Sequence, residues 1–115
     1  MAICVLIVDD EPAVRALATD ILSDAGFNTI ATADANQALH VLTREAENVD
    51  VLFTDVRMPG GMSGLELARV AKRKWPDLRV IITSGYFAGD FPSAEFLRKP
   101  WSASELVSRV EQAVP

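Results

Sequence analysis

The amino-acid sequence predicts a single α/β domain over residues 1–115, in which a doubly wound sheet of five parallel strands is covered by helices on both faces. Two observations support this fold class. Short apolar runs alternate with amphipathic stretches from one end of the chain to the other. The first run, residues 3–8, is apolar at every position and rich in β-branched side chains, which is typical of a strand buried on both faces.

The first helix is predicted between Pro12, which suits the first helical turn, and Gly26, which can adopt the left-handed conformation that ends a helix. Apolar side chains between these two residues recur at helical spacing. We expect this stripe to face the sheet, and it consists of Val14, Leu17, Ala18, Ile21, Leu22 and Ala25.

The second repeat of the pattern begins with a weaker strand candidate at residues 29–31. Asp34 then reads as the N-cap of a helix, with Gln37 reaching back to complete a capping box. A helical apolar stripe follows, and residues 49–54 supply the third strand.

A third helix is predicted to start at the capping box of residues 63–66 and to end at Lys74, because Pro76 cannot continue it. Residues 83–94 contain Gly85, Gly89 and Pro92 and leave space for one helical turn at most, so the fourth helix is expected to be shortened. The remaining elements are strands at 79–82 and 95–97 and a last helix capped by residues 102–105.

The charge balance excludes several classes of protein. With 11 basic and 16 acidic side chains the chain has a net charge of −5, whereas nucleic acids and anionic membranes favour a basic face. The longest apolar run is far shorter than the ~20 residues that cross a bilayer, and the start of the chain does not resemble a signal peptide. We therefore expect a cytoplasmic protein that binds neither membrane nor nucleic acid directly. Cys4 is expected to be a buried, inert thiol.

Polar side chains follow the predicted strands at the carboxyl edge, where parallel sheets bind ligands. Asp9 and Asp10 follow the first strand, and Asp55 follows the third. One carboxylate there could simply cap a helix. Three neighbouring carboxylates repel one another unless a cation lies between them, and a hard divalent ion is the usual answer. The sequence therefore predicts a Mg²⁺ site.

Lys99 and Ser84 are predicted at the same edge. The ammonium of Lys99, held by Pro100, could balance the carboxylates, and the Ser84 hydroxyl and Gly85 amide could hydrogen-bond an anion. Alone, Lys99 reads as an exposed lysine and Ser84 as a turn residue. Their position beside the three acids favours a functional role.

In this combination the chain resembles the receiver domains of two-component response regulators. The resemblance covers essentially all 115 residues and implies the strand order 2-1-3-4-5. The matching segments are residues 5–12, 55–59 with 64–66, 83–85 and 99–100.

The resemblance implies that Asp55 accepts a phosphoryl group from a phosphohistidine on a sensor histidine kinase or a histidine phosphotransfer protein. Asp10, Asp55 and the main-chain carbonyl of Arg57 would ligate Mg²⁺, while Asp9 would act through a coordinated water. These assignments suit phosphoryl transfer, which depends mainly on positioning and on neutralising charge.

The resemblance also assigns the phosphate-binding and switch residues. Ser84, Gly85, Lys99 and Val56 would contact the phosphoryl oxygens. Phosphorylation would draw Ser84 inward and change the rotamer of Phe96, for which plain core packing is an equal alternative. The bond between Lys99 and Pro100 is a candidate cis peptide.

Three features depart from the common receiver pattern. Residues 60–62 carry an extra residue, and the shortened fourth helix argues against the usual dimer surface. Arg57 and Tyr86 are both large where the family admits the hydrolytic water, which predicts slow autodephosphorylation. The lone histidine, His40, is expected on the surface and away from the site.

Three other functions are compatible with parts of this pattern. A phosphorylation-independent pseudo-receiver is the main alternative, although such domains usually lack an acid or the lysine. A magnesium-dependent aspartyl phosphatase of the haloacid dehalogenase type would need Asp-x-Asp after its first strand and a cap domain. A flavodoxin-type module would need a phosphate-cradling loop where the adjacent aspartates stand. We expect no enzyme beyond self-catalysed phosphorylation and dephosphorylation of Asp55.

Overall fold

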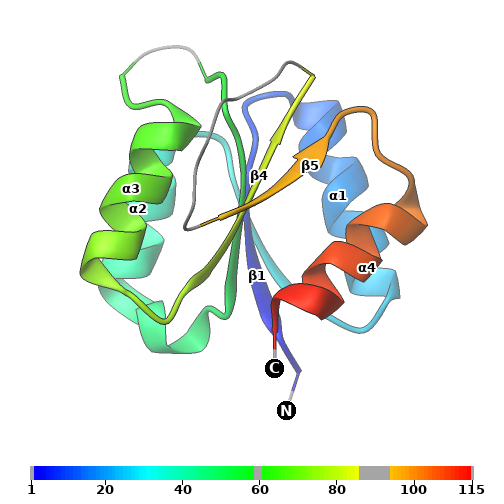
Figure 1. Ribbon diagram of the computed structural model, residues 1–115, viewed down its shortest axis with the longest axis horizontal. Coiled ribbons are helices and arrows are strands. Elements are labelled where there is room, and N and C mark those ends of the chain that lie inside the picture. The colour runs from blue at the N-terminus through cyan, green and yellow to red at the C-terminus, as the bar shows by residue number, and fades with distance from the viewer. Residues whose placement is uncertain (1, 59–60, 86–93, 115) are drawn as a thin grey trace.

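The computed structural model describes residues 2–58, 61–85 and 94–114 (Figure 1). Its five strands form one parallel sheet in the order β2-β1-β3-β4-β5, which confirms the predicted fold class and strand order. The strands are β1 (Cys4–Val8), β2 (Asn28–Thr32), β3 (Val51–Asp55), β4 (Arg79–Ser84) and β5 (Glu95–Arg98).

Helices cover both faces of this sheet. In Figure 1, α2 and α3 lie on one side of the strands and α1 and α4 on the other. The shortened helix predicted after β4 falls on residues 86–93, which lie outside the described residues. The described helices are α1 (Pro12–Asp24), α2 (Ala35–Glu45), the 3₁₀ turn η1 (Ala46–Asn48), α3 (Gly64–Lys74) and α4 (Ala103–Ala113).

Each face of the sheet has its own hydrophobic core because side chains alternate along the strands. On β1, Leu6 and Val8 pack toward α2 and α3, whereas Val5 and Ile7 pack toward α1 and α4. Every residue of β1 and of β3 is buried, as expected for central strands of a parallel sheet. Full burial of one Leu or Ile side chain contributes about 1.5–3 kcal/mol. The two cores therefore hold the strand ends in a defined register.

The capping boxes predicted at Ser63 and Ser102 are confirmed, whereas at Asp34 only the N-cap bond is, because Gln37 reaches past Asp34 to the preceding amide. The Ser63 hydroxyl accepts from the Glu66 amide at 3.2 Å, and Glu66 accepts in return from the Ser63 amide at 3.3 Å. Asp34 accepts from the Gln37 amide at 2.8 Å, and the Gln37 side chain reaches back to the amide of Ala33 at 2.9 Å. The bonds from the Glu66 and Gln37 amides satisfy N–H groups that the first helical turn leaves unpaired.

The prediction that the whole apolar stripe of the first helix faces the sheet is wrong at Leu17. Its side chain is 53% exposed, and Ala25 is exposed as well, while Ala18 and Leu22 are buried. A stripe this wide exceeds the strip of helix surface that the sheet and α4 cover, so its margin faces solvent. Among the described residues, no helix is long and apolar enough to cross a membrane.

Candidate functional site

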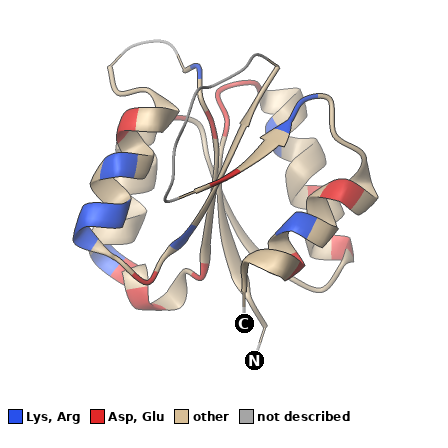
Figure 2. Cartoon of the chain, viewed as in Figure 1, with Lys and Arg blue, Asp and Glu red and all other residues tan. Residues whose placement is uncertain are grey.

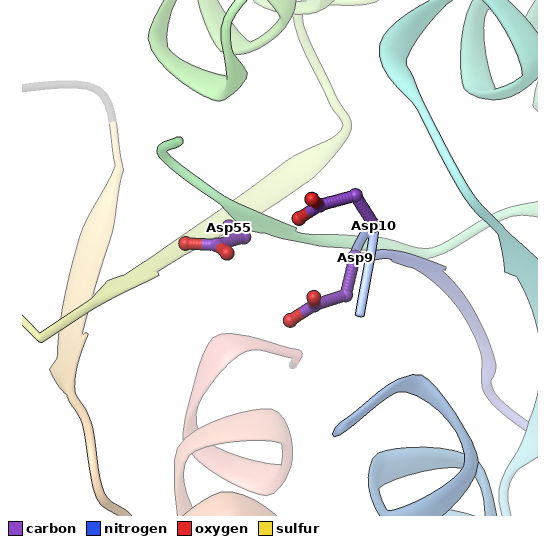
Figure 3. Close-up of side chains that lie close together, drawn as sticks. All are labelled: Asp9, Asp10 and Asp55. Carbon is purple, nitrogen blue, oxygen red and sulfur yellow. The ribbon is translucent and has the colours of Figure 1, made fainter. Parts of the chain in front are cut away.

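The predicted acids converge at the carboxyl ends of β1 and β3. Val8 pairs with Thr54 in neighbouring parallel strands, so the residues that follow them come side by side. Figure 3 shows Asp9, Asp10 and Asp55 grouped there, and one carboxylate oxygen from each lies within 4.8 Å of the others. Asp9 and Asp55 are buried, and Asp10 is half-buried. The structure therefore brings together all three acids that the sequence singled out.

Lys99 provides the positive charge that faces two of these acids, Asp9 and Asp55. Its Nζ lies 3.2 Å from Oδ2 of Asp9 and 3.2 Å from Oδ2 of Asp55. The peptide bond from Lys99 to Pro100 is cis, as the resemblance implied. The Lys99 amide donates to the main-chain oxygen of Ser84 at 2.9 Å, which ties the end of β5 to the end of β4.

Charge and burial shift the pKa values in this cluster. Burial raises the pKa of Asp55 above its ordinary value, although the ammonium of Lys99 acts to lower it. The pKa of Lys99 is also raised, because the attraction of Asp55 and Asp9 together outweighs the opposing effect of burial. Lys99 is therefore an ammonium at neutral pH, and additional positive charge nearby would favour the ionised form of Asp55.

The cluster suits a magnesium ion. Mg²⁺ prefers hard oxygen ligands and is usually held by one or two carboxylates with waters completing the shell. Asp10 and Asp55 offer two such carboxylates, and a single ammonium leaves the three acids only partly neutralised. In Figure 2 the loop after β1 is acidic, whereas the end of α3 carries basic residues.

Ser84 is the last residue of β4, and Gly85 follows it directly. Ser84 is buried at the strand end, and Gly85 is exposed. With Lys99, Gly85 lines a cavity of about 550 Å³ whose other walls are Val14, Leu17, Pro100 and Trp101. Two of the predicted phosphate-binding residues, Gly85 and Lys99, thus open onto one cavity.

The resemblance assigned roles to three further residues, Val56, Arg57 and Phe96. The Val56 amide donates to the main-chain oxygen of Thr83 at 3.1 Å and also acts to lower the pKa of Asp55. Arg57 is exposed. Phe96 is half-buried against the core under α2 and α3, and its main-chain oxygen accepts from Arg109 at 2.7 Å.

The remaining residues singled out in the sequence either lie away from the site or fall outside the described residues. His40 is exposed on α2, and Cys4 is buried, with its thiol pKa raised chiefly by burial. Tyr86 lies outside the described residues, as does Gly60 of the extra-residue loop.

The sequence analysis missed the role of Gly64. A Cβ at this position would overlap the main-chain oxygen of Asp55, so α3 begins in direct backbone contact with the end of β3. The Gly64 amide also donates to the main-chain oxygen of Val56 at 2.9 Å. Its place directly after the N-cap Ser63 was visible in the sequence, but its proximity to Asp55 depends on tertiary packing.

A second hollow of about 740 Å³ lies at the opposite end of the sheet, where β3 and β4 begin. Its walls combine Trp75 with residues of both charges, such as Asp50 and Arg79. None of the predicted site residues borders it. We therefore place the chemistry at the carboxyl edge, although the hollows lined there by Lys99 and by Asp10 are smaller, at about 550 and 610 Å³.

Known proteins resemble this chain in sequence and in fold. The family model described as response regulator receiver domain matches residues 5–111. The nitrogen assimilation regulatory protein NtrX of Azorhizobium caulinodans is 34% identical over 99% of this chain, which spans 26% of that protein. The sensor kinase CckA of Brucella abortus is 34% identical over 94% of this chain, which spans 12% of that protein.

Solved structures agree with these matches. The crystal structure of the receiver domain from the hybrid histidine kinase CckA is 33% identical, with a TM-score of 0.86 over 97% of this chain and 99% of that one. A response regulator receiver domain protein from Clostridium thermocellum gives a TM-score of 0.87 at 28% identity, over 96% of this chain and 93% of that one. With the match over residues 5–111 and the four strand-end motifs assembled at one edge, the chain belongs to the response regulator receiver domain family of two-component signalling.

Proposed function

We propose that Asp55 is the phosphoacceptor of this receiver domain. A carboxylate oxygen of Asp55 attacks the phosphorus of a phosphohistidine, the P–N bond breaks, and the released imidazole takes up a proton. The product is an acyl phosphate on Asp55. The observation that carries the proposal is the position of Asp55, which is buried between Asp10 and Lys99 at the end of β3.

Lys99 is proposed to hold the phosphoryl group. Its ammonium already lies 3.2 Å from Oδ2 of Asp55 and can follow the charge as it moves onto the phosphoryl oxygens. Charge-assisted hydrogen bonds of this kind are about twice as strong as neutral ones. Ser84, Gly85 and the Val56 amide would complete the set of donors.

Asp10, Asp55 and the main-chain carbonyl of Arg57 are proposed to hold Mg²⁺, with Asp9 acting through water. When bound, the ion would neutralise charge on the phosphoryl oxygens opposite Lys99. The grouping of three carboxylates, of which only Asp9 and Asp55 pair with Lys99, supports this proposal, because an additional cation offsets the remaining repulsion.

The output is proposed to pass through β4 and β5. If Ser84 moves toward a phosphoryl group, its main-chain bond to Lys99 carries the displacement to β5. Phe96, three residues before Lys99 and tied through its carbonyl to Arg109, would then change its packing.

The partner is proposed to be a sensor histidine kinase or a histidine phosphotransfer protein, acting in the cytoplasm. Similarity to the sensor kinase CckA and to the regulator NtrX supports this class of partner. The chain is proposed to catalyse only the phosphorylation and dephosphorylation of its own Asp55, with no separate substrate.

Incubation with acetyl phosphate and MgCl₂, followed by intact-mass measurement, tests the proposal. The wild type should gain the mass of one phosphoryl group, and Asp55→Asn should gain none. Omitting MgCl₂ should abolish the gain. An unmodified wild type would favour the pseudo-receiver alternative, and continuous release of phosphate would favour the phosphatase.

A further inference from the structure

Arg15 reaches back from the first turn of α1 to the acidic site. It is the fourth residue of this helix, and its Nη1 donates a hydrogen bond to the main-chain oxygen of Asp9 at 2.9 Å. The residue is half-buried. None of the roles proposed above uses it.

A cation at this position opposes the local preference of a helix. The unpaired N–H groups of the first turn give that end a partial positive charge, which favours acidic residues and disfavours basic ones. The first turn of α1 contains no acidic residue, and its N-cap Glu11 makes no side-chain capping bond. Local helix stability therefore does not explain Arg15, whereas its tertiary contact with Asp9 does.

This contact completes a set of bonds that holds every polar group of Asp9. The Asp9 amide donates to Thr32 at 3.2 Å, Oδ1 accepts from the Glu11 amide at 2.9 Å, and Oδ2 accepts from Lys99 at 3.2 Å. The main-chain oxygen accepts from Arg15. This oxygen belongs to the peptide plane that joins Asp9 to Asp10, so Arg15 sets the orientation of that plane.

We propose that Arg15 is a positioning residue for the Mg²⁺ site. By fixing the peptide plane between Asp9 and Asp10, its guanidinium sets the direction in which the Asp10 side chain leaves the backbone and meets Asp55. This inference rests on the proposed function, because it takes Asp10 and Asp55 as ligands of the cation.

The direction in which Mg²⁺ affinity changes when Arg15 is removed distinguishes a positioning role from a simple electrostatic one. A positive charge close to a cation site repels the cation, so a purely electrostatic Arg15 would weaken Mg²⁺ binding and its removal would strengthen it. Groups that orient metal ligands act in the other direction, and their loss typically weakens metal affinity about tenfold or more.

The experiment uses the full chain with Trp75→Phe, which leaves Trp101 as its single tryptophan, two residues after Lys99. MgCl₂ is titrated at constant ionic strength while the fluorescence of Trp101 and, separately, the unfolding temperature are measured. The variants are Arg15→Ala, Arg15→Lys and Arg98→Ala. Arg98 is exposed on β5, so its removal is a control that causes the same loss of charge.

The proposal expects Mg²⁺ affinity about tenfold lower in Arg15→Ala and unchanged or higher in Arg98→Ala. Arg15→Lys should lie between parent and Arg15→Ala, because an ammonium keeps the charge without the planar guanidinium. Parent affinity or tighter binding in Arg15→Ala, or an equal loss in Arg98→Ala, would overturn it.

Two other results are also decisive. If Arg15→Ala does not fold, parent affinity in Arg15→Lys overturns the inference, and weaker binding supports it. If the parent itself shows no Mg²⁺ response by fluorescence or by unfolding temperature, the proposed Mg²⁺ site is wrong and the inference is overturned with it.

Discussion

Gly64 and Asp55 meet through their backbones: the first residue of α3 lies so close to the end of β3 that any Cβ on Gly64 would overlap the main-chain oxygen of Asp55. The backbone of the proposed phosphoacceptor thus packs directly against the N-terminus of α3. Neither segment can adjust alone, because Asp55 ends a central strand and Ser63 and Glu66 cap the helix.

Gly64→Ala is therefore expected to lower the free energy of unfolding by about 1–3 kcal/mol. Denaturant unfolding measures this loss. Gly85→Ala is the matched control, because a Cβ at Gly85 meets nothing within 4 Å. Equal stability of the two variants would show that α3 can shift away from β3 at little cost.

Lys99→Ala should destabilise the protein by about 1–3 kcal/mol at pH 7, because Asp9 and Asp55 lose the ammonium between them. Since the folded-state pKa of Lys99 is raised, its contribution is fully present below its ordinary pKa and is lost as the pH rises through the raised value. Added MgCl₂ should recover part of the loss by binding the folded state. Thermal unfolding tests this, with exposed Lys74→Ala as control; equal losses in both variants would contradict it.

Asp55→Asn should raise the free energy of unfolding by about 1–2 kcal/mol at pH 7 without Mg²⁺, because it removes one of three crowded carboxylates. The folded-state pKa of Asp55 is raised, so its charged form costs stability above that pKa and the cost disappears as Asp55 becomes protonated at lower pH. The advantage of the variant should accordingly shrink on acidification. Asp20→Asn, at an exposed position of α1, is the control. An Asp55→Asn variant less stable than wild type at pH 7 would contradict the expected increase in the free energy of unfolding.

The titration of Asp55 can be followed directly by ¹³C NMR of its side-chain carboxyl. In the protein without Mg²⁺ it should titrate above its ordinary value of 3.8, because burial disfavours the charge. Lys99→Ala should move the pKa of Asp55 further up, since the ammonium acts to lower it. A titration at or below 3.8 in the wild type would show that Lys99 dominates over burial.

Slow autodephosphorylation is expected from the large side chains at residues 57 and 86. Arg57 is exposed beside the site, where it can cover the approach of water to a phosphoryl group on Asp55. After phosphorylation and removal of the phosphodonor, the doubly substituted variant Arg57→Ala with Tyr86→Ala should lose its phosphoryl group several-fold faster than wild type. Loss of the added mass over time provides the rate, and equal rates would end the shielding explanation.

The elements that could be predicted from the sequence are those with a local signal. The all-apolar run of β1, the capping boxes at Ser63 and Ser102 and the left-handed Gly26 each encode their structure within a few residues. Element ends moved by one or two residues, as for β3, which begins at Val51 rather than Val49. Such ends depend on which neighbouring strand supplies the hydrogen bonds.

Alternation of strands and helices by itself determined a parallel sheet, and hence that Asp9, Asp55, Ser84 and Lys99 would share one edge. Only the tertiary structure decided how they meet there. The pairing of one ammonium with two carboxylates, the backbone contact at Gly64 and the hold of Arg15 on Asp9 join residues that are 6 to 90 positions apart. The exposure of Leu17 likewise depends on how much of α1 its neighbours cover. Periodicity records what a residue prefers locally, whereas burial, pKa and close contact depend on atoms that packing brings from elsewhere in the chain.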